Sequence, residues 1–384
     1  MTDEKFLDKK MDRREFLKKA GIGGAGLALG LSGASAFFAN QDRSSKKALD
    51  GDEDISFFGK HQAGITTPMQ KACYLVVLDL HTTDKKEVIQ LFKDWTDYSS
   101  KLVEGELVKK DGSNALLPPT DTGETVGLNP YRLSLTFGVS ADFLKKLGLE
   151  SKRPKLFRDL PPFPKEQLQD KYTGGDIVIQ ACADDEQVAF HAVRNLIRKG
   201  RNKITMKWSK SGFAAIGDRK ETPRNLFGFK DGTANVTTEK EFDKVVWTDS
   251  KDWMKGGSYM ALRLVQMHLE TWDRTNLQEQ ENTFGRYKES GAPFGKKDEF
   301  DEVDLPILRR SYSYSDGIDE RTGQFDAGLI FIAYQKDPDR FVKIQTNLGA
   351  VDKMNEYITH IGSGLFACFA GVEKGGYLGQ ALFE

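Results

Sequence analysis

The chain has 384 residues, of which 39% are hydrophobic and 29% charged, and its formal net charge is −1 at pH 7. This length allows one large domain or two ordinary ones, each able to bury its own core. The composition is typical of a soluble globular protein and argues against a disordered or membrane protein. Without a basic stripe or a positive net charge, a nucleic-acid partner has no electrostatic support, and we expect none.

The first forty residues have the pattern of an export signal. Arg13 and Arg14 are followed by Phe16, Leu17 and an apolar stretch from Ala20 to Ala39 that is diluted by glycines and ends in small residues. Paired arginines before such a stretch are typical of the twin-arginine export pathway. A membrane anchor is the alternative, because twenty apolar residues could just span a bilayer, but the glycines and the arginine pair argue against it.

We therefore expect residues 1–40 to be a twin-arginine signal peptide and the polar residues 41–56 to be a linker. The protein would then work outside the cytoplasm, at the cell surface, in a periplasm-equivalent space or as a secreted protein. Because this pathway exports folded proteins, the signal also hints at a cofactor that is inserted before export. The folded body is expected to start near Phe57.

Two halves with similar patterns follow the linker. In the first half the residue pattern predicts strands at 73–80, 133–139, 176–183 and 204–213 and helices at 84–98 and 184–199. Val88, Leu91, Phe92 and Trp95 form the apolar face of the first helix, and the second helix has Asp184 or Asp185 at its cap.

The second half repeats this order. Strands are predicted at 258–269, 307–314, 327–335 and 364–370, and helices at 270–281, 338–348 and 351–361. Each half therefore approximates the order β-α-β-β-α-β of a ferredoxin-like module. The sequence predicts an α+β protein with tandem ferredoxin-like modules at 57–216 and 217–384.

The three cysteines, Cys73, Cys182 and Cys368, each lie in an apolar, strand-like run, and none has metal-ligand spacing. Buried small hydrophobic residues are the favoured interpretation. A disulfide between Cys73 and Cys182 is the alternative in an oxidising compartment.

The segment most indicative of chemistry is ETPRNLFGFKDGTANV, residues 221–236, in which Gly228 and Gly232 flank Asp231. Such glycines allow either a tight turn or the close approach of the backbone to a flat ligand. Taken alone, Lys230-Asp231-Gly232-Thr233 is more often a simple turn, because Asp-Gly is a common turn dipeptide.

The core of this segment, GFKDGTAN, resembles the GxxDG signature of the DyP-type (dye-decolourising) haem peroxidases. Five other stretches match the same family, and they are GKHQAGI at 59–65, PPTDTGE at 118–124, 174–196, TFGRYKESGAPFG at 283–295 and ILRRSYSYSDG at 307–317. The pattern is similar to the exported, Efe-type branch, whose members are also described as deferrochelatases. The resemblance implies the DyP-type fold of the dimeric α/β barrel-like superfamily, with the haem pocket in the second module and b-type haem as cofactor.

The resemblance also implies residue roles. Asp231 would move a proton between the two oxygens of hydrogen peroxide, and Arg309 would stabilise the departing oxygen. Gly232, Thr233 and Ala234 would lie along the haem edge together with Asp231 and Arg309. An ordinary exposed strand arginine is the alternative for Arg309, and Arg310 is expected to be structural.

One part of the family pattern is missing. Haem iron in this family is held by a histidine in a segment resembling SHVRLA just before the ILRR strand. Here Leu305 runs directly into Pro306 and the ILRR strand, and no histidine occurs between His268 and His360. The metal ligand is therefore unknown, and the expected segment is deleted between Leu305 and Pro306.

None of the five histidines is an obvious replacement. His61 and His191 match family histidines and are expected to be structural, whereas His81 is expected to be exposed. His268 is expected on the polar face of its strand. His360 is expected at the end of a helix, in a solvated or capping position.

The leading functional hypothesis is a haem b-dependent peroxidase that reduces hydrogen peroxide and oxidises donors by one electron, linked to iron uptake or to iron release from haem or porphyrin. Its expected partners are hydrogen peroxide, a haem, porphyrin or electron-donor substrate, and an Efe-type iron permease and lipoprotein. A haem- or porphyrin-binding component without peroxidase turnover is the alternative, and a structural partner of the permease is a third. The oligomeric state is left open.

Aromatic side chains could relay electrons to bulky substrates at the surface. Core packing is the favoured interpretation for most of them, because aromatic residues dominate protein cores. The residues concerned are Trp208, Trp247, Trp253, Tyr312 and Tyr314.

Overall fold

The structure is a computed structural model that describes residues 55–109, 114, 116–216, 222–299 and 305–384. The predicted signal peptide and nearly all of the predicted linker lie outside the described residues. Phe57, where the folded body was expected to start, is buried. No helix within the described ranges is long and apolar enough to cross a lipid bilayer.

The first module contains four strands in the order expected from the sequence. The strands are β1 (Ala72–Leu80), β2 (Ser134–Val139), β3 (Ile177–Ala183) and β4 (Ile204–Phe213). The helices are α3 (Lys85–Leu102), α4 (Ala141–Lys146) and α5 (Glu186–Gly200), with short 3₁₀ turns at Glu150–Lys152 and Asp170–Tyr172. The strands lie in the order β2-β3-β1-β4, which is that of a ferredoxin-like module.

The second module repeats this arrangement after helix α6 (Glu239–Val245). Its strands are β5 (Ser258–Met267), β6 (Leu308–Arg309), β7 (Tyr312–Asp319), β8 (Gln324–Gln335) and β9 (Ile358–Cys368). Its helices are α7 (Leu269–Asp273), α8 (Leu277–Phe284), α9 (Pro338–Val351) and α10 (Gln380–Phe383), with a 3₁₀ turn at Lys353–Glu356. The strand order β9-β5-β8-β7 again matches a ferredoxin-like module.

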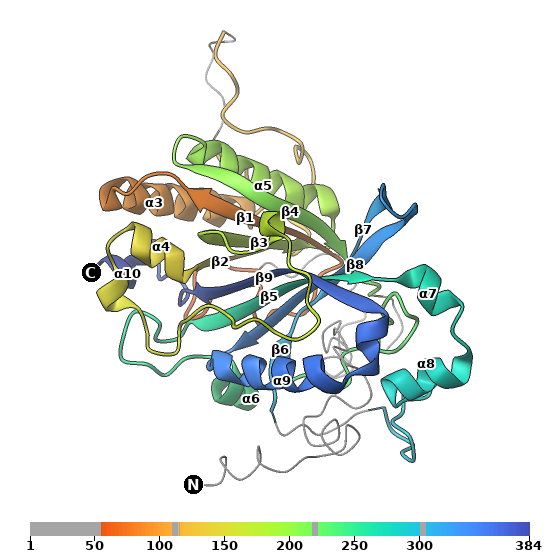
Figure 1. The fold of residues 1–384 in the computed structure, drawn as a ribbon. Helices are drawn as coiled ribbons and strands as arrows, with labels where there is room; N and C mark the ends of the chain where they lie inside the picture. The colour runs from red at the N-terminus through yellow and green to blue at the C-terminus, as the bar shows by residue number, and fades with distance from the viewer. Residues whose placement is uncertain (1–54, 110–113, 115, 217–221, 300–304) are drawn as a thin grey trace, which may run out of the picture.

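The two modules share one antiparallel sheet that closes on itself. Strand β2 pairs with β9, β4 pairs with β7, and β5 pairs with both β9 and β8, so the described strands form a closed barrel with β6 as an extra strand on β8. Helices α3 and α5 lie side by side over one side of this barrel, and α9 lies on the opposite side (Figure 1). Closure satisfies strand edges that each module alone would leave unpaired.

Helices α3 and α5 form where the sequence predicted them because each has one apolar face and a capping aspartate. Asp84 accepts a hydrogen bond from the amide of Lys86, and Asp185 accepts one from the amide of Val188. The four predicted apolar residues of α3 are all buried. Trp95 Nε1 donates a 2.8 Å hydrogen bond to the Leu196 carbonyl, which joins the two helices.

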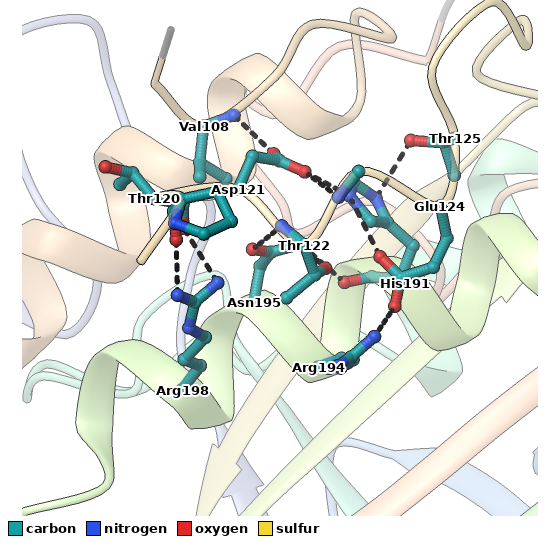
Figure 2. A network of polar contacts seen from close by, with 12 residues as sticks. Val108, Thr120, Asp121, Thr122, Glu124, Thr125, His191, Arg194, Asn195 and Arg198 are labelled. Carbon is teal, nitrogen blue, oxygen red and sulfur yellow. Dashed lines mark hydrogen bonds and ion pairs between the residues drawn. The ribbon is translucent and has the colours of Figure 1, made fainter. Parts of the chain in front are cut away.

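A polar network fastens the segment before β2 to helix α5 (Figure 2). His191 Nε2 lies 2.8 Å from Asp121 Oδ1, and His191 Nδ1 lies 3.1 Å from Thr125 Oγ1. Asn195 Nδ2 donates to Thr122 Oγ1 at 2.9 Å. Burial raises the pKa of Asp121, but hydrogen bonds from His191 and from the amides of Val108 and Gly123 outweigh it and lower that pKa below its usual value.

The predicted helix at 351–361 was wrong. Only a 3₁₀ turn capped by Asp352 forms at Lys353–Glu356, and β9 begins at Ile358, six residues before the predicted strand start. Pairing of this segment with β5 overrides its helical spacing, because Ile358 and Thr359 are β-branched and fit a sheet well. His360 is therefore buried inside a strand, and its expected solvated or capping position was also wrong.

Two other elements are divided. The predicted helix at 270–281 consists of α7 and α8, because Asn276 caps a new helix by accepting a hydrogen bond from the amide of Glu279. The predicted strand at 307–314 is interrupted between β6 and β7. The backbone amide of Arg310 still donates a 2.8 Å hydrogen bond to the Ile332 carbonyl.

The predicted aromatic and cysteine residues lie in the core. All three cysteines are buried as free thiols. The five aromatic residues named for electron relay are also buried, which supports the packing interpretation; they are Trp208, Trp247, Trp253, Tyr312 and Tyr314.

Candidate active site

The loop before Asp231 is built around the side chain of Asn225. Asn225 Oδ1 accepts hydrogen bonds from the backbone amides of Phe227 and Phe229 at 3.0 and 3.2 Å. The backbone amide of Asn225 donates to the Phe229 carbonyl. Asn225 Nδ2 then donates to Asp231 Oδ2 at 3.3 Å. One asparagine therefore shapes the turn and also holds the carboxylate that follows it.

An aromatic cluster anchors the same loop. The Phe229 ring stacks on Phe284 with a centroid distance of 3.9 Å, and the Phe227 ring lies 4.5 Å from Trp272. Trp272 Nε1 also donates to the Phe227 carbonyl at 3.1 Å. Because Trp272 lies in α7 and Phe284 in α8, these two helices hold the loop that leads to Asp231.

A second asparagine positions Arg309. Asn235 Nδ2 donates to the Arg309 carbonyl and the Arg309 amide donates to Asn235 Oδ1, both at 2.8 Å. On its other side Arg309 pairs with Ala333 in β8. The Asn235 side chain thus makes the two backbone hydrogen bonds that a neighbouring strand would make to Arg309, and it links the segment after Asp231 to β6.

Asp231 and Arg309 are both buried, and each affects the charge state of the other. Burial raises the pKa of Asp231 to about 6, although the positive charge of Arg309 and the hydrogen bond from Asn225 both lower it. Burial lowers the pKa of the Arg309 guanidinium, and the charge of Asp231 acts in the opposite direction. Asp231 Oδ1 is buried without a hydrogen-bond partner among the described residues.

The remaining predicted cofactor-contacting residues lie beside Asp231. Gly232 has φ = 106°, a conformation that favours glycine, and Thr233 is buried. Ala234 is half-buried. Their contact with haem stays a prediction.

Polar and charged residues near Glu299 hold the loop that leads to Asp231. Lys230 Nζ forms an ion pair with Glu299 at 2.6 Å, and Thr222 donates to the same carboxylate at 2.6 Å. Arg286 is buried and donates to the carbonyls of Gly291 and Glu299, each at 2.8 Å. This bracing holds both ends of the loop that carries Asp231.

Four of the five histidines have a ring nitrogen engaged elsewhere. His61 Nδ1 contacts the Gly256 carbonyl at 2.6 Å and its ring stacks on Trp247, and His191 belongs to the network on α5. His81 is exposed, as expected, and contacts Thr205. His268 follows β5, is half-buried and contacts Thr359.

His360 is the one histidine for which no ring contact is found among the described residues, and its Nε2 is buried without a partner. His360 pairs with Val265 on β5. Four residues before Val265 on the same strand, Ala261 pairs with Ala333 on β8, and Ala333 in turn pairs with Arg309 on β6. His360 and Arg309 therefore occupy the same face of the sheet, about 15–20 Å apart from strand spacings. At this separation His360 does not contact the candidate site, and burial and the positive charge of Arg263 lower its pKa well below the usual value.

Two hollows in the described surface lie away from Asp231 and Arg309. One of about 500 Å³ is lined by residues that include Phe163, Glu166 and Ser363, and one of about 420 Å³ lies around α10. Among the described residues no group of three or more histidine, cysteine or acidic side chains is placed to hold a metal ion.

Comparison with known proteins decides the family. The model of the N-terminal part of Dyp-type peroxidases matches residues 62–214, and the model of the C-terminal part matches residues 222–373. The chain belongs to the Dyp-type peroxidase family. It is 35% identical over 418 residues to a deferrochelatase of Shigella boydii, covering 97% of both chains, and 36% identical to one of Yersinia pseudotuberculosis, covering 95% of this chain and 93% of the relative.

Solved structures of Dyp-type peroxidases agree. An oxyferrous complex of DtpA from Streptomyces lividans superposes with a TM-score of 0.80 at 35% identity, covering 87% of this chain and 98% of that one. A DyP-type peroxidase from Cellulomonas bogoriensis gives a TM-score of 0.79 at 31% identity, covering 87% and 99%. The predicted α+β fold of two ferredoxin-like modules is confirmed.

The alignment with the Shigella relative spans 418 positions, more than the 384 residues of this chain. That deferrochelatase therefore has stretches that this chain lacks. The shortened crossing between Leu305 and Pro306 is one position at which the sequence predicts such a loss.

Sequence reasoning singled out Asp231 and Arg309 but missed the two asparagines that position them. Asn225 and Asn235 were within the segment quoted as informative, and their positions on either side of Asp231, six residues before and four after, were the available signal. Their roles depend on contacts with a loop backbone and with a distant strand, which spacing alone does not reveal.

Proposed function

We propose that this Dyp-type peroxidase is a haem b-dependent enzyme that reduces hydrogen peroxide and oxidises a donor by one electron. The observation that carries the proposal is the buried pair of Asp231 and Arg309, in which one carboxylate oxygen has no hydrogen-bond partner among the described residues. A buried polar atom without a partner is costly, and a catalytic role is one recognised reason for keeping it.

In this proposal Asp231 Oδ1 takes a proton from the inner oxygen of peroxide and delivers it to the outer oxygen. Its raised pKa, about 6, allows the group both to accept and to release a proton near neutral pH. Asn225 holds Oδ2, so that Oδ1 is the oxygen left to exchange the proton.

Arg309 stabilises the negative charge that develops on the departing oxygen. Its guanidinium is buried, so its charge is weakly screened by water and acts strongly at short range. The backbone of β6 is fixed by Asn235 on one side and by β8 on the other, which keeps this charge in place.

The described residues fit only one side of a haem. Asp231, Gly232, Thr233, Ala234 and Arg309 would line the side on which peroxide binds, and haem would supply the redox-active iron. No described histidine contacts this group of residues, so none is assigned to hold the haem iron.

This mismatch favours a second candidate function, a haem- or porphyrin-binding component of an iron-uptake system without peroxidase turnover. The same pocket would hold the porphyrin, while the missing axial ligand would remove the support for O–O cleavage. Release of iron from haem or porphyrin, as the name deferrochelatase of the relatives suggests, would be compatible with either function.

The test is an absorption spectrum of the full chain produced with ample haem, followed by peroxide-dependent oxidation of a dye. For the enzyme we expect a Soret band, stoichiometric haem and turnover that falls about 10²–10⁴-fold in Asp231→Asn and substantially in Arg309→Leu. The exposed neighbours Asp273→Asn and Arg274→Leu serve as matched controls and should retain the turnover of the parent chain.

Stoichiometric haem without turnover would favour the binding component. Absence of haem binding would contradict both proposed functions. Unchanged turnover in both Asp231→Asn and Arg309→Leu would show that these residues do not carry the reaction.

We also propose that residues 1–40 export the protein through the twin-arginine pathway and that it works beside an Efe-type iron permease and lipoprotein. The Arg13-Arg14 pair supports the first part. Replacing both arginines by lysine should retain the protein in the cytoplasm, which cell fractionation would measure; unchanged export would contradict the assignment.

A further inference from the structure

The interior of the barrel contains an ionisable cluster that the proposed peroxidase site does not use. Cys73 on β1 and Cys182 on β3 both belong to the core cluster inside the barrel, together with Tyr312 and Tyr334. Arg310, next to Arg309 in sequence, is also buried there. Alternation of side chains along the chain sends Arg309 to one side of the sheet and Arg310 to the other.

The two cysteines are directly opposite each other across a strand pair. Cys73 is the register partner of Cys182 in the antiparallel ladder of β1 and β3, so both side chains lie on the same face of the sheet. Directly opposed residues have Cα atoms about 4.5–5.5 Å apart. This separation lies inside the range that disulfides span, about 4.4–6.8 Å, so the backbone need not move for a bond to form.

Arg310 brings a positive charge to this thiol pair. Its guanidinium donates to the Thr67 carbonyl and to Gln70 Oε1, which are both neutral acceptors. No carboxylate lies within ion-pair distance of Arg310 in the described ranges. A buried cation without a carboxylate favours ionisation of whatever acid lies closest.

The acids around Arg310 are two thiols and two phenols. Burial raises the pKa of Tyr312 and of Tyr334, so the phenols stay protonated. Burial also raises the pKa of Cys182, but the contact with Cys73 and the charge of Arg310 outweigh it and lower that pKa. Burial and the contact with Cys182 raise the pKa of Cys73. Arg310 and Tyr312 both contact the Cys182 sulfur, so Cys182 is the thiol of the pair that these neighbours stabilise as a thiolate.

We propose that Cys73 and Cys182 form a peroxide-oxidisable dithiol inside the barrel, in which Cys182 is the attacking and Cys73 the resolving cysteine. The arrangement of an activated thiol beside a second thiol is that of redox-sensitive cysteine pairs. It is independent of haem and of Asp231.

The chemistry balances with hydrogen peroxide as the oxidant. The Cys182 thiolate attacks one peroxide oxygen, the O–O bond breaks, and the leaving hydroxide takes up a proton to become water, which leaves a sulfenic acid on Cys182. The Cys73 sulfur then attacks the Cys182 sulfur, its proton and the hydroxyl group leave as a second water, and the disulfide forms. Two thiols lose two electrons and one peroxide gains two.

Both sulfurs are buried, so peroxide reaches them only through openings of the barrel. Cys368 provides an internal control because it is equally buried in the barrel, and burial raises its pKa without an opposing cation. The pair and the control thus differ in charge environment and in neighbours, but not in exposure.

The experiment is a thiol count after denaturation of the full chain, before and after treatment with excess hydrogen peroxide and quenching. We expect three thiols before treatment and one afterwards, with a mass lower by two hydrogen atoms and a peptide that links Cys73 to Cys182. The same protein prepared without haem should give the same result, which separates this inference from the proposed peroxidase function.

Single variants assign the two roles. In Cys73→Ala we expect Cys182 to stop at sulfenic acid, which a dione reagent would trap, and in Cys182→Ala we expect Cys73 to stay reduced. Cys368→Ala should form the disulfide as the parent chain does. Circular dichroism would establish that each variant is folded.

Three thiols remaining after peroxide treatment of the parent chain would overturn the proposal. So would oxidation of Cys368 to the same extent as the pair. Equal oxidation of Cys73 with and without Cys182 would overturn the assignment of the attacking residue.

Discussion

Asp231 is buried with one carboxylate oxygen held by Asn225 and the other without a described partner, and its pKa is raised to about 6. The unfolded chain releases this proton near the ordinary value of 3.8, so between these two pH values the folded state binds more protons than the unfolded state. Stability from this group is therefore fully present below the unfolded pKa and is lost as pH rises through the folded pKa.

This linkage predicts a pH-dependent difference between the parent chain and Asp231→Asn. The shift corresponds to about 3 kcal/mol, so the free energy of unfolding of the parent chain should fall by about that amount relative to the variant between pH 4 and pH 7. Urea unfolding at several pH values would measure the difference. A difference that stays constant with pH would contradict the raised pKa.

Asn235 gives a second prediction at the scale of one residue. Asn235→Ala removes two 2.8 Å hydrogen bonds to the Arg309 backbone, which should cost about 1–3 kcal/mol in the free energy of unfolding. Because Asn235 acts through Arg309, peroxide-dependent turnover should fall more than donor affinity changes. Asn235→Asp, which keeps the acceptor oxygen but not the donor, should lie between the parent and the alanine variant.

At the scale of elements, α5 holds the segment before β2 through buried groups rather than through its exposed ion pair. His191 and Asp121 are both buried, whereas Arg194, which pairs with Glu124, is exposed (Figure 2). Buried polar contacts are costly to leave half-made, and exposed ion pairs contribute little.

We therefore expect His191→Leu to lower the free energy of unfolding by about 1–3 kcal/mol and to speed proteolysis of the segment 105–131. Arg194→Ala, the matched change one turn away on the same helix, should cost no more than about 1 kcal/mol. Urea unfolding and limited proteolysis measure both effects. Equal losses in the two variants would show that burial does not decide the strength of this network.

At the scale of the whole molecule, closure of the barrel depends on a tight contact between the modules. A Cβ on Gly138 would lie 3.0 Å from Cys368 Sγ and 3.1 Å from both Phe366 and Val178, where β2 meets β9. Gly59, by contrast, has only one atom near such a Cβ, at 3.7 Å.

The module boundary at 216/217 stays a prediction, since closure joins both modules in one sheet.

Gly138→Val should overpack this seam and lower the free energy of unfolding by about 1–3 kcal/mol, with a lower Tm. Gly59→Val is the matched control and should have a much smaller effect. If Gly138→Val and the control have equal Tm values, the contact between β2 and β9 at Gly138 can accept a larger side chain without loss of stability. Differential scanning calorimetry would make the comparison.

The sequence by itself determined the features that depend on neighbours along the chain. The spacing of apolar residues and the capping aspartates predicted α3 and α5, and the apolar runs predicted most strands. The GFKDGTAN and ILRR segments identified the family, and the role of Asp231 stays a prediction. Such signals are local, because periodicity and capping involve residues within a few positions of one another.

Only the tertiary structure decided which distant residues meet. Pairing with β5 made residues 358–361 a strand and buried His360, barrel closure placed Cys73, Cys182 and Arg310 in one interior, and Asn235 came to lie against β6. These contacts join residues more than seventy positions apart. Their free energies depend on the burial and pairing of the whole sheet, which no local pattern in the chain encodes.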